Sequence, residues 1–290
     1  MKTIKTWLVV LRMKHWIKNF FVLVPFLVGP RFGLNEYLVR SISGTVLFGV
    51  MSSAVYLFND IVDIASDRRH PEKRLRPVAS GKVSVSEAGV VGGLFAFVAL
   101  LFALFLDHRF FMILGIYAAN NLLYSLYLRG KTVLDVMSIA AGFVMRVYAG
   151  GYLIDIEVTH WLVVCVFSLS LLMGFGKRRA EYEDLQDEAK RTRQVHESYT
   201  IPKLNILLGV SASVTIVTYM LYSMAPETKA LHGTDNLIFT TPFVVYCIYR
   251  FLLKAQEGRR GDPVELILRD RGFLLAGSLW LVSIVYFTQL

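Results

Sequence analysis

The sequence predicts an all-α integral membrane protein with nine transmembrane helices around a cavity that opens to the cytoplasm. Two observations support this fold class: 55% of the 290 residues are hydrophobic, and long apolar runs recur along the whole chain. A run of about 20 apolar residues is long enough to cross the hydrocarbon core as a helix. The polar segments between the runs are too short to hold a core of their own. Residues 1–290 are therefore expected to form a single membrane domain.

The first 19 residues, MKTIKTWLVVLRMKHWIKN, form a basic and amphipathic stretch. Lys14 and Lys18 interrupt the apolar core that a signal peptide requires. We therefore expect residues 1–19 to form an amphipathic helix that lies along the cytoplasmic membrane surface. The first span follows at 20–32, where two prolines predict a short or kinked helix.

The remaining apolar runs predict eight more spans, and the distribution of charge predicts their direction. Lys and Arg concentrate before the first span and in the loops that follow the even-numbered spans. Because loops rich in Lys and Arg lie in the cytoplasm, we expect the N-terminus on the cytoplasmic side of the cell membrane and the C-terminus on the outer side. The two largest cytoplasmic loops are 59–88 and 177–203, and both are expected to face the cavity. The eight spans are expected at 38–61, 89–106, 110–128, 133–154, 161–176, 204–225, 237–253 and 272–290.

Four polar residues at helical spacing end the second span: Asn59, Asp60, Asp63 and Asp67. Residues three and four apart share one face of a helix, so we predict three carboxylates on a single face. Carboxylates that close repel each other unless a cation neutralises them, and Mg²⁺ prefers oxygen ligands. We therefore predict a Mg²⁺ site at these residues that bridges the protein and a diphosphate. A solvated loop also carries acidic residues, but the continued helix face favours a site.

Basic residues near this motif predict anionic ligands. Cytoplasmic loops carry Lys and Arg without any ligand, so the basic residues are weaker evidence than the acidic motif. The net charge of +9 is divided among short loops, which favours anionic lipid and phosphorylated substrates as partners over nucleic acid. The candidates are Lys73, Arg74 and Arg76 after the acidic motif, and Lys177, Arg178 and Glu181 after the sixth span.

Arg146 is the only strong cation predicted deep inside a span, away from its ends. It is either a functional residue or half of a buried pair with Asp135, and the sequence leaves both interpretations open. Tyr124 is either an interfacial residue or a ligand. The two cysteines and the histidines lack partners at metal-ligand spacing, so neither a disulfide nor zinc is expected.

The acidic residues match the motif NDxxDxxxD, and this motif after the second of nine spans resembles the UbiA superfamily of intramembrane transferases. Within it, further segments are similar to the decaprenyl-phosphate phosphoribosyltransferase branch. In that branch GKRRAE stands where prenyltransferases carry a second aspartate-rich motif. The similar segments are RMKHWIKN (12–19), HPEKRLRPVASG (70–81), YSLYLRGKTVLDVMSIAAGFVMRVYAGG (124–151) and GKRRAE (176–181).

The resemblance implies a UbiA-like bundle and a Mg²⁺-dependent reaction. In it, 5-phosphoribose passes from 5-phosphoribosyl 1-diphosphate to a polyprenyl phosphate of the decaprenyl type, which supplies pentose for cell-envelope arabinan. Members of the branch look like trimers. The acceptor phosphate is already ionised near pH 7, because its second pKa is about 6, so no strong general base is expected.

The resemblance also suggests roles for individual residues. Catalysis is assigned to Asp60, Asp63, Asp67 and Lys177, with the three aspartates and Asn59 as metal ligands. Lys14 and Lys18 are expected near the lipid phosphate. The other substrate-binding candidates are Asn59, Lys73, Arg74, Arg76, Tyr124, Arg146, Arg178 and Glu181.

Two alternative functions stay open at the level of sequence. One is prenyl transfer from a prenyl diphosphate to an aromatic acceptor, against which the missing second aspartate-rich motif counts. The other is transport of a phosphorylated lipid such as a polyprenyl phosphate, since transporters also place polar residues in spans. Metal-dependent release of diphosphate would separate either enzyme from the transporter.

Overall fold

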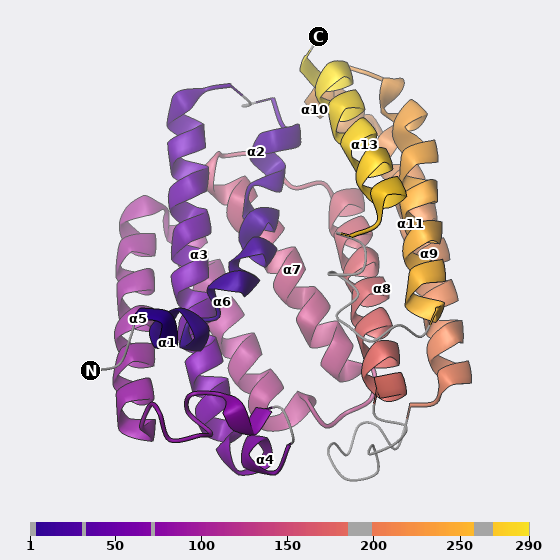
Figure 1. The fold of residues 1–290 in the computed structure, drawn as a ribbon. Coiled ribbons are helices and arrows are strands. Elements are labelled where there is room, and N and C mark those ends of the chain that lie inside the picture. Colours follow the sequence, from indigo (N-terminus) through magenta and orange to yellow (C-terminus); the bar gives the residue numbers. More distant parts are fainter. Residues whose placement is uncertain (1–3, 31–32, 71–72, 185–198, 258–268, 290) are drawn as a thin grey trace. The chain divides into compact units, whose positions relative to one another are not determined.

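The structure is a computed structural model that describes residues 4–30, 33–70, 73–184, 199–257 and 269–289 (Figure 1). Every regular element in these ranges is a helix, so the all-α prediction is confirmed for them. The elements in chain order are α1 (Ile4–Val10), η1 (Met13–Val22), α2 (Val24–Val28), α3 (Asn35–Val62), α4 (Ile64–Arg69), η2 (Lys73–Leu75), α5 (Val85–Leu106), α6 (His108–Leu123), η3 (Tyr124–Leu128), α7 (Leu134–Leu153), α8 (His160–Asp184), α9 (Ile201–Met224), α10 (Pro226–His232), η6 (Asn236–Thr240), α11 (Thr241–Gln256) and α13 (Arg271–Gln289).

Eight helices in the described part of the chain are long and apolar enough to cross a membrane. They correspond to the second to ninth predicted spans. The first predicted span, 20–32, has a different structure. It combines the end of the 3₁₀ helix η1 with the five-residue helix α2. The eight candidates are α3, α5, α6 with η3, α7, α8, α9, η6 with α11, and α13.

The N-terminal stretch also differs from the continuous helix expected over residues 1–19. Helix α1 ends at Val10, and Arg12 adopts a left-handed backbone conformation with φ 50°. Residues other than glycine rarely adopt this conformation, and η1 begins directly after it. Leu8, Val9 and Ile17 are exposed apolar residues on these segments, as expected for a surface that meets lipid.

Contacts divide the chain into two compact units, which are described separately. The first comprises Met1–Phe26, Gly33–Arg129 and Met145–Ile156. The second comprises Leu27–Phe32, Gly130–Val144 and Glu157–Leu290. Helix α7 contributes its first half to the second unit and its second half to the first.

Helix α3 is the centre of the first unit, where it packs against α5, α6 and η1 (Figure 1). Small residues on α3 permit this close packing. A Cβ atom on Gly49 would lie 2.7 Å from the Trp16 ring, and one on Gly44 would lie 2.1 Å from Leu153 Cδ1. Trp16 also donates from Nε1 to Ser53 Oγ at 3.0 Å. The two Trp16 contacts attach η1 to α3, and the Leu153 contact joins α3 to the end of α7.

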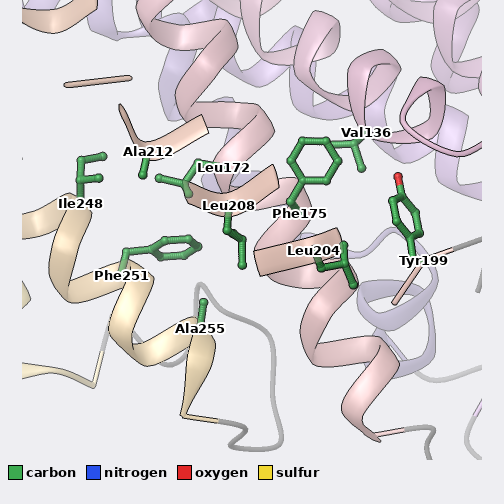
Figure 2. Close-up of a cluster of buried hydrophobic side chains, with 10 residues drawn as sticks. All are labelled: Val136, Leu172, Phe175, Tyr199, Leu204, Leu208, Ala212, Ile248, Phe251 and Ala255. Carbon is green, nitrogen blue, oxygen red and sulfur yellow. The ribbon is translucent and has the colours of Figure 1, made fainter. Parts of the chain in front are cut away.

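The second unit has a core formed by α7, α8, α9 and α11 (Figure 2). Gly174 and Gly176 of α8 allow neighbouring side chains to approach, because a Cβ on either would lie under 3.0 Å from Val136 or Phe251. The end of α8, which carries GKRRAE, is therefore tightly packed. The buried side chains of this core are Val136, Leu172, Phe175, Tyr199, Leu204, Leu208, Ala212, Ile248, Phe251 and Ala255.

Candidate functional site

The acidic motif lies at the C-terminal end of α3, but the helix is not continuous through it. Helix α3 ends at Val62, and Asp63, with ψ −2°, separates it from α4. This ψ is far from the helical value of about −42°, so the expected single helix is interrupted at Asp63. The four-residue spacing persists, because Asp63 N–H donates to Asn59 O at 2.9 Å and Asp67 N–H donates to Asp63 O at 2.8 Å.

Asp60 and Asp67 are buried, and their carboxylates converge on one arginine. Arg76 Nη1 lies 2.7 Å from Asp67 Oδ2 and 3.5 Å from Asp60 Oδ1. Arg12 forms a second ion pair with Asp60, and its guanidinium lies 4.7 Å from the centre of the Tyr56 ring. The left-handed turn at Arg12 thus brings the N-terminal stretch to the first aspartate of the motif.

Asp63 and Asn59 have partners from the η3 region instead. Arg129 forms an ion pair with Asp63, and Ser125 Oγ donates to Asn59 Oδ1. Residues Tyr124–Leu128 form a π-helical turn, a feature that is frequent at functional sites. Ser125 and Arg129 therefore belong to the surroundings of the motif.

Arg12, Ser125 and Arg129 were missed as site residues by sequence reasoning. Arg12 opens the segment RMKHWIKN, and the other two lie in YSLYLRGK, so both segments had been noted for their resemblance. The sequence therefore pointed to these segments as a whole and not to Arg12, Ser125 or Arg129 individually. Their partners are 48 to 66 positions away along the chain, a separation that helical spacing does not report.

The other predicted residues of the first unit have varied positions. Arg74 and Lys14 are exposed, whereas Lys73, Lys18 and Tyr124 are half-buried. Lys73 and Arg74 lie on the short helix η2, next to Arg76. Of the basic candidates after the motif, Arg76 contacts the motif carboxylates.

Arg146 is buried within the first unit. Its Nε donates to Asn19 Oδ1 at 2.9 Å, its Nη2 donates to Tyr117 Oη at 3.0 Å, and its guanidinium lies 4.9 Å from the centre of the Phe48 ring. Through Asn19 it holds η1 against the helices of this unit. Asp135, considered as its buried partner, belongs to the second unit and binds other residues.

In the second unit, α8 continues through GKRRAE to Asp184, so the predicted loop 177–203 begins as a helix. Arg178 donates from Nε to Asp135 Oδ2 at 2.7 Å and from Nη1 to Glu181 Oε2 at 2.5 Å. The Tyr199 hydroxyl donates to Asp135 Oδ1 at 3.1 Å. Burial, followed by the nearby Asp135 carboxylate, raises the pKa of Tyr199 to about 12. Tyr199 therefore remains a hydrogen-bond donor at neutral pH.

The two neighbours of Arg178 in the motif have different surroundings. Arg179 is buried and donates to Asn205 Oδ1 at 2.8 Å and to the carbonyl oxygen of Ala255 at 2.5 Å. Since Ala255 lies in the last turn of α11, Arg179 caps the C-terminus of that helix. Lys177 is half-buried.

The oxygen-bearing side chains of the acidic motif are the candidates in the first unit to bind Mg²⁺. Among the described residues, no group of three or more His, Cys, Asp or Glu side chains is placed to hold a metal ion. The carboxylates of Asp60 and Asp67 nevertheless surround one cationic nitrogen of Arg76, and carboxylate oxygens are the ligands that Mg²⁺ prefers. Asp63 is paired with Arg129 instead. The chemistry of these residues therefore fits a hard divalent cation.

Comparisons with known proteins agree with this fold. The sequence profile of the UbiA prenyltransferase family matches residues 21–270. The chain is 31% identical to decaprenyl-phosphate phosphoribosyltransferase of Mycolicibacterium smegmatis, with 96% of this chain and 91% of the relative covered. It is also 31% identical to the protein of that name from Corynebacterium glutamicum, with 95% and 84% covered.

The fold has a solved counterpart. A UbiA homolog from Archaeoglobus fulgidus, bound to DMAPP and Mg²⁺, superimposes with a TM-score of 0.72 at 18% sequence identity. The similarity covers 98% of this chain and 99% of that one. At this identity the likeness shows the fold alone, which is UbiA-like.

Proposed function

Because the chain belongs to the UbiA prenyltransferase family, we propose that it is a transferase that moves 5-phosphoribose from 5-phosphoribosyl 1-diphosphate to a polyprenyl phosphate of the decaprenyl type. Diphosphate is released, and the product is a polyprenyl-phosphoryl-5-phosphoribose for cell-envelope pentose synthesis. Relatives that bear the matching name align over nearly the whole chain.

The observation that carries the proposal is that each of the three motif aspartates contacts an arginine. Arg12, Arg76 and Arg129 bring three guanidinium groups to one acidic motif. A prenyl diphosphate presents one anionic group, whereas a phosphoribosyl donor adds a 5-phosphate. Guanidinium groups bind phosphates through paired hydrogen bonds, so this surplus of arginine favours the phosphoribosyl donor.

Asn59, Asp60, Asp63 and Asp67 are the residues that would hold Mg²⁺. When bound, the ion stabilises negative charge on the departing diphosphate. Arg12, Arg76 and Arg129 contact the same carboxylates, so they are placed to bind phosphate oxygens of the donor. Lys73 and Arg74, on the adjacent η2, are assigned to the remaining donor phosphate.

The acceptor side requires positioning rather than a base. One oxygen of the ionised polyprenyl phosphate attacks C1 of the ribose as the bond from C1 to the diphosphate oxygen breaks, and no proton is transferred. Lys14 and Lys18 of η1 are assigned to the lipid phosphate, and Tyr124 to the substrate near the motif. In the second unit Lys177 is assigned to a substrate phosphate. Glu181 supports the segment GKRRAE, to which Lys177 belongs, through its ion pair with Arg178.

The membrane arrangement forms part of the proposal. The helices η1 (Met13–Val22) and α2 (Val24–Val28) include most of the described part of the first span expected from the sequence. We assign them as the ninth crossing of the cell membrane, which leaves the N-terminus cytoplasmic and the C-terminus outside. The cytoplasm-facing cavity and a homotrimer stay predictions.

Transfer of label tests the function. Purified protein is incubated with ribose-labelled 5-phosphoribosyl 1-diphosphate and decaprenyl phosphate, and butanol-extractable label is counted with and without Mg²⁺. We expect labelled lipid from the wild type, and a loss of at least 10²-fold on removing the metal or in Asp60→Ala. Asp155→Ala, which removes an exposed carboxylate paired with Arg109 in the same unit, is the matched control.

Two other outcomes of this assay assign a different function. Consumption of a prenyl diphosphate without movement of ribose label would assign prenyl transfer. Consumption of neither donor would favour a transporter.

A further inference from the structure

Asp135 connects three segments of the second unit through buried hydrogen bonds. It is 0% exposed, and its two carboxylate oxygens accept from Tyr199 and from Arg178. Tyr199 lies just before α9, Arg178 lies near the end of α8, and Asp135 lies in the first turn of α7. Figure 2 shows Tyr199 at the edge of the apolar core, near Leu204.

Tyr199 also holds a strained piece of backbone. Val133 has φ 69°, and its N–H donates to the Tyr199 hydroxyl oxygen at 2.7 Å. A β-branched residue in this left-handed region is an outlier. Such strain persists only where surrounding contacts impose it, and it concentrates at functional sites. The hydrogen bonds around Tyr199 therefore point to more than a stable core.

We assign Arg178 to the support of the segment GKRRAE, through its ion pairs with Asp135 and Glu181, rather than to contact with substrate. Its side chain is 6% exposed, and its Nε and Nη1 are engaged by two carboxylates. This differs from the substrate-binding role expected from the sequence. Arg179 is equally buried and is bound to α9 and α11.

Anchoring two consecutive residues sets the direction of a third. Side chains on successive residues of an α-helix point about 100° apart. The bonds from Arg178 to α7 and from Arg179 to α9 and α11 restrict rotation of the last turns of α8. The direction of Lys177, one residue earlier, is therefore set by these anchors.

We propose that Tyr199, Asp135 and Arg178 are positioning residues that direct the Lys177 ammonium group to a phosphate of the substrates. This inference rests on the function proposed above. Tyr199 acts through Asp135, and Asp135 acts through Arg178. The three residues contribute to the rate by keeping Lys177 in one orientation.

The test compares two buried tyrosines of the second unit. Tyr199→Phe removes the hydroxyl that binds Asp135 and Val133. Tyr219→Phe, the matched control, removes a buried hydroxyl bonded to Thr240 and Trp280. Tyr219 lies 18 residues into α9, or about 27 Å along the helix from its start. Turnover, the KM for phosphoribosyl diphosphate and the thermal unfolding midpoint are measured for both variants.

We expect Tyr199→Phe to lower kcat about tenfold, because misplacement of one charged group by a fraction of an ångström is costly, while the donor KM changes less than about twofold. Tyr219→Phe is expected to change the unfolding midpoint alone. In a Lys177→Ala background, Tyr199→Phe should have no further effect on kcat, since residues that act through one another are not additive. Where Lys177→Ala leaves no measurable rate, the comparison of the two tyrosines decides.

Equal losses in the two tyrosine variants, or an undiminished loss from Tyr199→Phe in the Lys177→Ala background, would overturn the positioning role while leaving the proposed function intact. Wild-type protein that transfers no ribose label would overturn both. Arg178→Lys provides a second variant, for which we expect the same fall in kcat at unchanged donor KM.

Discussion

The arginine–aspartate pairs at the acidic motif of the first unit and the Arg178–Asp135 pair of the second unit differ in the exposure of the arginine. At the acidic motif, the side chains of Arg12, Arg76 and Arg129 are 20%, 31% and 26% exposed. In the second unit, Arg178 is 6% exposed and Asp135 is fully buried. A partly exposed guanidinium can exchange a carboxylate for a phosphate at low cost, because water screens the intermediate arrangement. Separating a fully buried pair costs more, because it leaves an uncompensated charge away from water.

The largest expected effect comes from breaking the buried pair. Asp135→Ala leaves the Arg178 charge buried with one carboxylate partner removed, and loss of one member of a buried pair costs about 3–5 kcal/mol. We expect most of this variant to unfold or to be lost during purification. The yield of monodisperse protein in detergent and the denaturant midpoint measure the effect. Stability close to that of the wild type would show that the second unit tolerates the Arg178 charge without Asp135. The buried pair would then not differ in this respect from the pairs at the acidic motif.

Removal of an arginine at the acidic motif should lower the transfer activity more than the stability. Arg12→Ala takes away a partly exposed partner of the buried Asp60 carboxylate, but Arg76 remains 3.5 Å from that carboxylate, so the fall in unfolding free energy should be smaller than the ~3–5 kcal/mol expected for Asp135→Ala. Transfer activity should fall about 10²-fold, as expected for loss of one group that stabilises developing charge. Arg109→Ala, in a partly exposed pair of the same unit, is the control and should retain activity. Equal activity in the two variants would exclude Arg12 from the site.

The smallest expected effect tests whether the packing of η1 on α3 positions Arg12 beside Asp60. Gly49→Ala places a Cβ 2.7 Å from the Trp16 ring, and overpacking of this kind costs about 1–3 kcal/mol. The displaced η1 should also carry Arg12 away from Asp60 and reduce transfer several-fold. Gly93→Ala is the control, because a Cβ there has no neighbour within 4 Å. An active Gly49→Ala protein with lowered stability would show that Arg12 does not depend on this contact.

Much of the architecture was predictable because lipid imposes a simple rule. Backbone groups in a hydrocarbon core must be satisfied within a helix, so apolar length alone predicts eight of the spans that the structure contains. The single helix predicted over 20–32 differs from the structure, because η1 is a 3₁₀ helix that ends before Pro25. Local composition does not distinguish a 3₁₀ helix from an α-helix.

The candidate site was predictable in part for a similar reason. Asn59, Asp60, Asp63 and Asp67 lie within nine residues of each other, so their grouping is a local property that helical spacing reveals. The interruption at Asp63 was not visible, since carboxylates and their arginine partners determine the geometry there. The role of Arg178 depended on Asp135 and Tyr199, which are 43 residues before it and 21 after it.

The sequence by itself determined that this is a helical membrane protein with an acidic motif at the end of its second apolar run, because hydrophobicity and helical periodicity are properties of neighbouring residues. Only the tertiary structure decided which of the many arginines serve that motif. Arg12, Arg76 and Arg129 reach it, whereas Arg178 and Arg179 are bound within the second unit. All five are arginines in polar segments, and their different partners follow from what lies within hydrogen-bonding distance once the chain has folded.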